Sequence, residues 1–309
     1  MENNIQLKEM IRSMVIDVLE GKKQETASSQ RIKQASRGQV EPGVFDTVDE
    51  AIQAAKVAQE RFEDCTLATR EKVIADIRAA MRPRVQELAQ KTVEETGMGR
   101  VADKVLKLNL TLDKTPGVED LVTECETGDN GMTLYELSAY GVIGAITPST
   151  NPAETLICNT IGMLAAGNAV FFSVHPGAKH LSRLLVSELN QIISKSIGIE
   201  NLIVTLSEPS IESAQEMMVH PDVSLLVVTG GPGVVKQALQ SGKKVIGAGA
   251  GNPPAFVDET ADIKKAAQDI VLGASLDNNI LCIAEKSVVA MRQIEPQLVQ
   301  EMVRVGCVL

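Results

Sequence analysis

The sequence has few aromatic residues and no tryptophan. Phe, Tyr and Trp together make up 2% of its 309 residues. Proteins that bind single-stranded nucleic acid stack bases on such side chains, so this chain offers few positions for that contact. Basic charge is also scarce, because 40 acidic residues outnumber 30 basic ones and the net charge is −10. Binding to a phosphate backbone needs clustered basic surface, so we expect no nucleic-acid partner.

The chain also lacks the patterns of a disulfide framework, a metal site or a membrane span. Its cysteines are odd in number, widely spaced and without CxxC pairs, and its three histidines share no ligand-like spacing with them. This usage is typical of a reduced intracellular protein, so we expect a cytoplasmic location and no metal. No apolar run approaches the roughly 18 residues of a membrane span, so we expect no membrane partner.

The first 20 residues predict an amphipathic helix on a tether. Apolar residues from Ile5 to Leu19 recur at helical spacing. Residues 21–44 are polar and rich in Ser and Gln, which indicates a flexible linker. Two interpretations remain open from this pattern. The helix could pack on its own body or a sister subunit, or it could target the chain to a groove of another protein.

The body begins near Phe45 and alternates helices with apolar strands. A capping box at residues 47–50 opens the first predicted helix. Further helices are predicted at 68–81, 83–95, 101–112, 153–166, 178–196, 210–219, 233–240 and 261–273, with a last one opened by Pro296. Strands are predicted at 132–138, 141–146, 169–174, 202–206, 224–228, 244–246 and 287–290. Strands that alternate with helices of this length imply a parallel sheet covered on both faces, so we expect a five-stranded Rossmann-type α/β domain.

Three loops of this predicted sheet could bind a ligand, because ligands bind beyond the carboxyl ends of the strands. The loops at 147–152, 173–177 and 229–233 offer hydroxyls, glycines and helix starts that suit phosphate. Each could also be an ordinary tight turn, and the GxGxG start at 247–251 is weak by itself. The cofactor-binding candidates are Thr147, Pro148, Ser149, Ser173, His175, Pro176, Thr229, Gly230, Gly231 and Gly249.

Cys282 is the candidate nucleophile. It lies in GASLDNNILCIAEK, where polar residues precede and follow it. A free cysteine is often a buried small hydrophobe, but these neighbours are typical of a loop at a functional site. A thiolate here could attack a carbonyl carbon and hold a thioester.

Several segments, in the same order along the chain, resemble those of the CoA-acylating aldehyde dehydrogenases of bacterial microcompartments, of the propionaldehyde and acetaldehyde types. They are ETGMGR, TPGVEDL, TGDNGMTLYE, ITPSTNPAET, AAGNAVFFSVHPGAK, VVTGGPG, GAGAGNPPAFVDETAD and NNILCIAEK. The resemblance implies an NAD-binding domain at 45–258 and part of a catalytic α/β domain at 259–309. It implies that Cys282 takes an aldehyde to a thioester with NAD, and that coenzyme A accepts the acyl group. It also likens residues 1–20 to an encapsulation peptide, which places the protein inside a microcompartment with a shell or partner protein.

Departures from hydrolytic members of the family sharpen this expectation. Where those enzymes carry a glutamate that activates water, this chain has Ala248, so a thiol acceptor can win the acyl group. The oxyanion-stabilising asparagine aligns with Thr150, while Asn151 follows it, so either side chain could serve. Ser173 stands where many relatives have a ribose-binding lysine, which favours NAD over NADP.

The resemblance also implies more chain than is present. Family catalytic domains continue beyond the cysteine, whereas this sequence ends at Leu309. We therefore expect an incomplete second domain. The resemblance also implies that full-length relatives form homo-oligomers. The alternative is a truncated, inactive protein that binds nucleotide or associates with the microcompartment.

Overall fold

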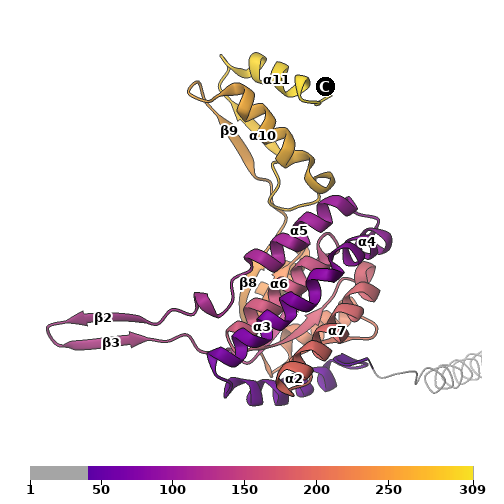
Figure 1. The fold of residues 1–309 in the computed structure, drawn as a ribbon, viewed down its shortest axis with the longest axis vertical. Coiled ribbons are helices and arrows are strands. Elements are labelled where there is room, and N and C mark those ends of the chain that lie inside the picture. The colour runs from indigo at the N-terminus through magenta and orange to yellow at the C-terminus, as the bar shows by residue number, and fades with distance from the viewer. Residues whose placement is uncertain (1–40, 309) are drawn as a thin grey trace, which may run out of the picture. The chain divides into compact units, whose positions relative to one another are not determined.

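The computed structural model describes residues 41–308. The targeting helix predicted at 1–20, and the linker predicted at 21–44 up to residue 40, lie outside the described residues. The described part alternates strands and helices through most of its length (Figure 1).

The first helices follow the predicted boundaries closely. Helix α2 (Val48–Glu63) begins at the predicted cap, where the Thr47 hydroxyl accepts a hydrogen bond from the Glu50 backbone N–H at 3.3 Å. Helices α3 (Leu67–Met81), α4 (Val85–Thr96) and α5 (Val101–Lys114) come next. The prediction that Pro83 opens α4 is wrong by two residues. Pro83 lies in a separate 3-10 turn, and α4 begins at Val85.

Six parallel strands form the central sheet, in the order β1-β6-β5-β4-β7-β8. Their bounds are β1 (Val44–Phe45), β4 (Val142–Ile146), β5 (Ala169–Ser173), β6 (Ile203–Leu206), β7 (Val223–Thr229) and β8 (Lys244–Ala248). The expected parallel α/β architecture is confirmed, with one strand more than the five predicted. The additional strand, β1, is two residues long and pairs with β6.

The strand order creates a switch point between β4 and β7. From β4 the chain proceeds outward to β5 and β6, and then returns to β7 and β8 on the other side of β4. At such a point the connections leave in opposite directions and open a crevice at the carboxyl ends of the strands. Ile146 and Val228 pair at this end of the two strands.

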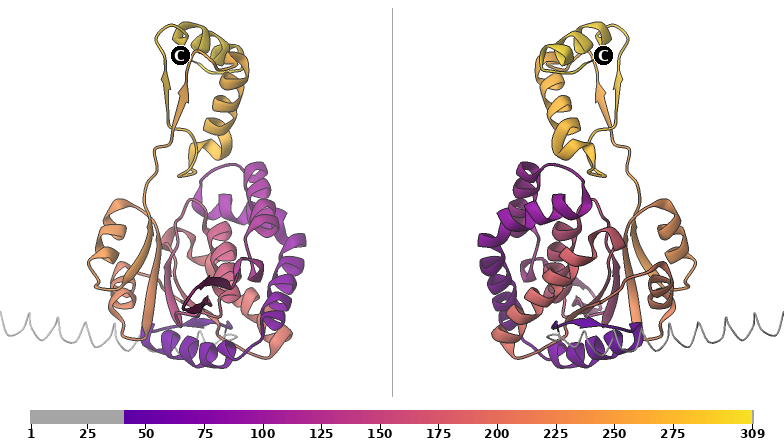
Figure 2. Two further views of the ribbon diagram at one scale, coloured as in Figure 1. Left: turned by 90° about the vertical axis from the view of Figure 1, so that its left-hand side faces the viewer. Right: turned by 90° about the vertical axis from the view of Figure 1, so that its right-hand side faces the viewer.

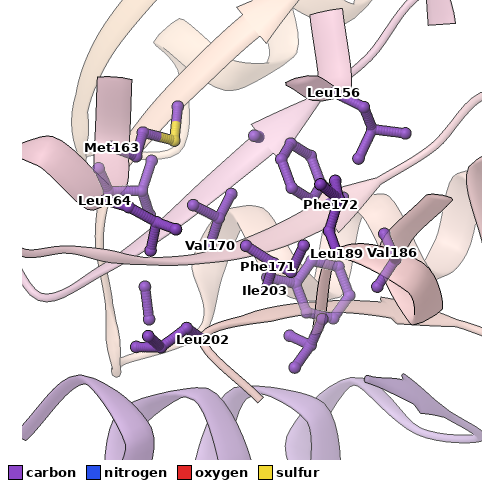
Figure 3. Packing of buried hydrophobic residues seen from close by; sticks show 14 of the residues in the cluster. Leu156, Met163, Leu164, Val170, Phe171, Phe172, Val186, Leu189, Leu202 and Ile203 are labelled. Carbon is purple, nitrogen blue, oxygen red and sulfur yellow. The ribbon is translucent and has the colours of Figure 1, made fainter. Parts of the chain in front are cut away.

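Helices cover both faces of the sheet (Figure 2). Helices α6 (Pro152–Ala165) and α7 (Lys179–Ile197) pack on one face with α3 against them. Helices α2 and α8 (Ile211–Val219) pack on the other face, and α9 (Pro232–Leu239) lies beside α8. Phe171 and Phe172 of β5 point to opposite faces and are both buried in the core shown in Figure 3.

A hairpin interrupts the connection from α5 to β4. Strands β2 (Glu124–Gly128) and β3 (Gly131–Tyr135) pair antiparallel, and every residue in both is exposed. The strand predicted at 132–138 is thus confirmed in type but ends at Tyr135, and its partner β2 was not predicted.

The C-terminal segment forms a small lobe with its own sheet. Strands β9 (Pro254–Val257) and β10 (Ser287–Ala290) pair parallel, and helices α10 (Ile263–Ser275) and α11 (Glu295–Arg304) pack with them. Because β9 belongs to this second sheet, we propose a domain boundary near residue 250 rather than at 258. None of the described helices is long and apolar enough to cross a bilayer.

Candidate active site

The three predicted loops all leave the carboxyl ends of the central strands. Because β4, β5 and β7 are parallel, their following loops share one edge of the sheet. Backbone hydrogen bonds join the loops to their neighbours there. The N–H of Thr147 donates to the carbonyl of Ser173 at 3.2 Å, and the N–H of Gly230 donates to the carbonyl of Ala248 at 3.1 Å.

Two hydroxyl residues of this edge are buried. Thr147 is 2% exposed, and its Oγ1 has no hydrogen-bond partner among the described residues. Ser173 is 8% exposed. A buried hydroxyl without a partner is costly, so Thr147 is suited to bind a ligand. His175 is exposed, and its Nδ1 accepts from the Gly177 N–H at 3.0 Å.

The remaining loop residues lie nearer the surface. Pro148 and Ser149 are half-buried, as are Thr229 and Gly230, whereas Pro176, Gly231 and Gly249 are exposed.

The helices that follow β5 and β7 differ in what their first backbone N–H groups bind. At the start of α7, the N–H groups of His180 and Leu181 both donate to the Glu95 carboxylate, each at 2.8 Å. Helix α9 has no side-chain cap at Gly231, and a Cβ built there meets nothing within 4 Å. The N–H groups that an anion would bind are therefore open at α9 and occupied at α7.

Cys282 is exposed in a loop whose two sides are joined by hydrogen bonds. The Lys286 ammonium donates to the carbonyl oxygens of Asn279 at 2.7 Å and Leu281 at 2.9 Å. The Asn279 amide donates to the carbonyl of Glu285 at 3.1 Å. These bonds connect the residues before the thiol to the residues after it.

The carbonyl oxygen of Cys282 also lies against the glycine-rich 247–251 run. A Cβ built on Gly251 would approach that oxygen to 2.0 Å. Only glycine permits this approach of the two backbones, so the residue type at 251 is explained by the position of the Cys282 loop.

A buried charged cluster, which the sequence analysis did not predict, lies five residues before the thiol. Asp277 Oδ2 accepts from Lys107 Nζ at 2.5 Å and pairs with Lys104 Nζ at 3.0 Å, and both Asp277 and Lys104 are fully buried. Asp277 Oδ1 accepts from the Arg100 backbone N–H at 2.8 Å. The backbone N–H of Asp277 donates to Asp103 Oδ2 at 2.9 Å.

The same lysines bind the loop after β4. Lys104 Nζ donates to the carbonyl of Thr150 at 2.5 Å, and Lys107 Nζ donates to Asn151 Oδ1. Lys107 also pairs with Glu154 at 3.2 Å. Asn151 Nδ2 lies 3.3 Å from Thr150 Oγ1 and donates to it. Lys104, Lys107, Asp277 and Glu154 are called the charged cluster below.

Burial and pairing act in opposite directions on this cluster. Burial alone raises the pKa of Asp277, but hydrogen bonds from Lys107, the Arg100 N–H and Lys104 lower it more, so it lies below its ordinary value. Burial lowers the pKa of Lys104, although the Glu154 charge opposes the change. Asp277 is therefore held as a carboxylate.

Thr150 and Asn151 are connected to the Cys282 loop only indirectly in the described residues. The charged cluster links the turn before Cys282 to Thr150 and Asn151. No hydrogen bond joins Cys282 itself to either residue in the described part. Nor does any group of three or more His, Cys, Asp or Glu side chains within residues 41–308 gather to hold a metal.

Known proteins resemble this chain over most of its length. The sequence profile of the aldehyde dehydrogenase family matches residues 19–305. The chain belongs to this family. It is 50% identical, over 92% of its length, to a propanal dehydrogenase (CoA-propanoylating) of Salmonella typhimurium. It is 49% identical, over 85% of its length, to the acetylating acetaldehyde dehydrogenase EutE of Escherichia coli.

Solved structures show the same relationship at the level of the fold. A propionaldehyde dehydrogenase from a fucose-utilisation microcompartment of Clostridium phytofermentans matches 87% of the chain with a TM-score of 0.84 and 51% identity. A Rhodopseudomonas palustris propionaldehyde dehydrogenase, solved with bound CoA and an acylated cysteine, matches 86% with a TM-score of 0.83 and 50% identity. The expected aldehyde dehydrogenase fold is thereby confirmed.

The chain spans only part of these relatives. It covers 62% of the Salmonella enzyme, 56% of EutE, 62% of the Clostridium structure and 61% of the Rhodopseudomonas structure.

Proposed function

We propose that this chain carries the cofactor site and nucleophile of a CoA-acylating aldehyde dehydrogenase, which converts a short aldehyde to its acyl-CoA with NAD. The supporting observation is the arrangement around Cys282. The thiol is exposed on a fastened loop, and the charged cluster joins that loop to Thr150 and Asn151. Relatives at about half identity are described as CoA-propanoylating and acetylating enzymes.

The chemistry assigned to the chain's own residues begins at the thiol. The Cys282 thiolate adds to the aldehyde carbon, and the carbonyl oxygen becomes an oxyanion. The Cys282 N–H, together with Asn151 or Thr150, would stabilise that oxyanion. When bound, NAD supplies the hydride acceptor that turns the adduct into a thioester. The CoA thiolate then attacks the thioester carbon, and the Cys282 thiolate leaves.

Ala248 is the reason to favour CoA over water as acceptor. It ends β8, its side chain is exposed, and a methyl group cannot remove a proton from water. A general base contributes typically 10²–10⁴-fold, so hydrolysis of the thioester should be slow.

The first test measures NADH formation with acetaldehyde and propionaldehyde, with and without CoA. We expect formation that depends on CoA and is abolished by Cys282→Ala. Cys158→Ala is the matched control, because Cys158 is also an exposed thiol, and it should retain activity. Activity that survives in Cys282→Ala would overturn the assignment. NAD⁺ binding without turnover would indicate the alternative, a non-catalytic nucleotide-binding protein.

For the cofactor, we propose that the pyrophosphate binds at the start of α9 and that NAD is preferred to NADP. The open N–H groups at the start of α9 and the Thr147 hydroxyl, which has no partner among the described residues, support the position. The neutral Ser173 supports the preference, although an engineered glycolyl-CoA reductase 50% identical to this chain was solved with NADP⁺.

Titration calorimetry with NAD⁺ and NADP⁺ tests this cofactor site. Gly231→Asp should weaken binding, because a carboxylate at the helix start repels phosphate. Gln215→Glu adds the same charge at an exposed position of α8 and should bind like the unsubstituted protein. Equal affinity of all three proteins would refute the position.

We further propose that residues 1–20 target the protein to a microcompartment, where they bind a shell or partner protein. The support is the apolar stripe in the sequence and the microcompartment origin of the Clostridium relative. Residues 1–20 fused to a fluorescent protein should form puncta in cells that make microcompartments. Leu7→Glu with Met14→Glu should disperse them, because the stripe is interrupted. Diffuse fluorescence of the unsubstituted fusion would contradict the proposal.

A further inference from the structure

Asp277 and the two residues after it adopt a backbone conformation that non-glycine residues rarely take. Asp277, Asn278 and Asn279 have φ of 51°, 56° and 60°, all in the left-handed region. Three such residues in succession persist only where the surroundings hold them. The Asp277 carboxylate packs closely against the backbone of Gly99. A Cβ at position 99 would lie 2.1 Å from Asp277 Oδ1, so a larger residue would not fit there.

The surroundings of this turn are charged and buried. Asp277 and Lys104 are fully buried, and Lys107 and Glu154 are 11% and 10% exposed in their side chains. Two ammonium groups face two carboxylates, so the cluster is neutral as a whole. Buried charges are tolerated when they are paired in this way, and removal of one partner leaves an uncompensated charge.

The lysines join two segments far apart in sequence. Their helix, α5, contributes both ammonium groups to Asp277, which is on the nucleophile side. The same two groups reach the carbonyl of Thr150 and the amide oxygen of Asn151, on the oxyanion side. A change in the position of either segment therefore breaks its bonds to the lysines that also hold the other segment.

Lys107 also decides how the Asn151 amide is oriented. An ammonium group only donates, so the carboxamide must turn its oxygen toward Lys107. The NH₂ group is then directed away from Lys107, with one hydrogen for Thr150 Oγ1 and one left for a substrate oxygen. This orientation favours Asn151 over Thr150 as the oxyanion donor.

From these contacts we propose that Lys104, Lys107 and Asp277 are positioning residues, which hold the Cys282 loop and the Asn151 amide in fixed relation to each other. The proposal rests on the proposed function for its catalytic consequence. None of the three needs to touch substrate. The electrostatic pairs hold the left-handed turn, the turn sets where the nucleophile loop begins, and Lys107 sets the direction of the amide.

The test compares three variants of the full chain. Lys107→Met leaves the cluster with an excess negative charge, and Asp277→Asn leaves it with an excess positive charge. The double variant is neutral again but lacks the link to Asn151. Both single variants should lower the melting temperature, and the double variant should recover most of that loss. Lys91→Met is the control, because Lys91 is exposed on α4 and, among the described residues, pairs with Glu87 alone, at 3.8 Å.

Readouts of position separate this role from a merely structural one. Amide hydrogen exchange across residues 276–286 and the alkylation rate of Cys282 should rise in both single variants and stay raised in the double variant. With CoA and aldehyde, kcat should fall by about 100-fold in the double variant, the loss that a misplacement near 1 Å can cause, while KM for NAD⁺ stays unchanged. The Lys91→Met control should match the unsubstituted protein in all readouts.

Two outcomes would overturn the proposal. One is unchanged exchange and alkylation in the single variants. The other is a double variant in which exchange and alkylation recover together with the melting temperature, because this would show that the cluster only balances charge. If the unsubstituted chain forms no NADH, the proposed function fails by itself. The exchange and alkylation measurements would still decide whether these residues position the loop.

Discussion

Gly249 and Gly251 meet different surroundings although one residue separates them. A Cβ on Gly251 would lie 2.0 Å from the Cys282 carbonyl oxygen, whereas a Cβ on Gly249 meets nothing within 4 Å. We expect Gly251→Ala to destabilise the fold by about 1–3 kcal/mol, as overpacking typically does, and to alter the alkylation rate of Cys282. Gly249→Ala is the matched control and should change neither quantity in the absence of cofactor. Urea unfolding and mapped alkylation check this, and two variants that behave alike would contradict it.

Asp277 should also contribute to stability in acid. Its pKa lies below the ordinary value of 3.8, so the folded protein binds this proton more weakly than the unfolded chain. The stability that Asp277 contributes is then fully present above the ordinary value and is lost as pH falls through it toward the folded-state pKa. The free energy of unfolding should therefore depend less steeply on pH below about pH 5 in Asp277→Asn.

Asp76→Asn is the control for this acid effect. The pKa of Asp76 is also lowered, first by its hydrogen bond from Lys72, but its side chain is 43% exposed. Added salt should therefore remove the effect of Asp76→Asn and leave that of Asp277→Asn, because exposed pairs are screened and buried ones much less so. If salt removes both effects, the Asp277 pair is not shielded from solvent.

At the scale of elements, hairpin β2–β3 has both faces exposed. Met132 and Leu134 lie on the same face and are 70% and 58% exposed. An isolated two-stranded hairpin is at best marginally stable in water. We expect fast amide exchange across 124–135 in dilute solution. If the chain forms the homo-oligomer expected of its relatives through this hairpin, exchange should slow as protein concentration rises, and Leu134→Glu should prevent that. Exchange independent of concentration in both proteins would contradict this use of the hairpin.

The elements also show how far the sequence could predict the structure. The parallel sheet was predictable because each core strand is a short apolar run between helical segments, as in residues 169–173. Strand β1 is too short to show a period, and β2 (Glu124–Gly128) carries few apolar residues. The Cys282 loop was found from its polar neighbours. Its attachment to α5 was not, because Lys104 and Asp277 lie 173 residues apart, and a lysine in a helical pattern predicts a solvent-exposed position.

At the scale of the whole described chain, the two hydrophobic cores differ greatly in size. The main core extends from Val48 to Ala238, whereas the small lobe has only Val257, Ala267, Ile270 and Leu298 buried together. Local stability depends on such buried apolar contacts. The small lobe should therefore open at a lower temperature than the central sheet, in a step that breaks two-state behaviour.

Hydrogen exchange and limited proteolysis during a temperature ramp would resolve the two steps of this unfolding. Residues 254–304 should lose protection first, while strands β4 and β5 remain protected. Asp277→Asn should lower the temperature of the first step, because the carboxylate joins the lobe to α5. It should leave the temperature of the second step nearly unchanged, because Asp277 lies outside the main core. Leu189→Ala, in the main core, is the opposite control. It should lower the temperature of the second step, because the cavity that it creates destabilises the main core by about 2–5 kcal/mol. Loss of protection at one common temperature in all three proteins would show that the charged cluster couples the lobe and the sheet into a single cooperative unit.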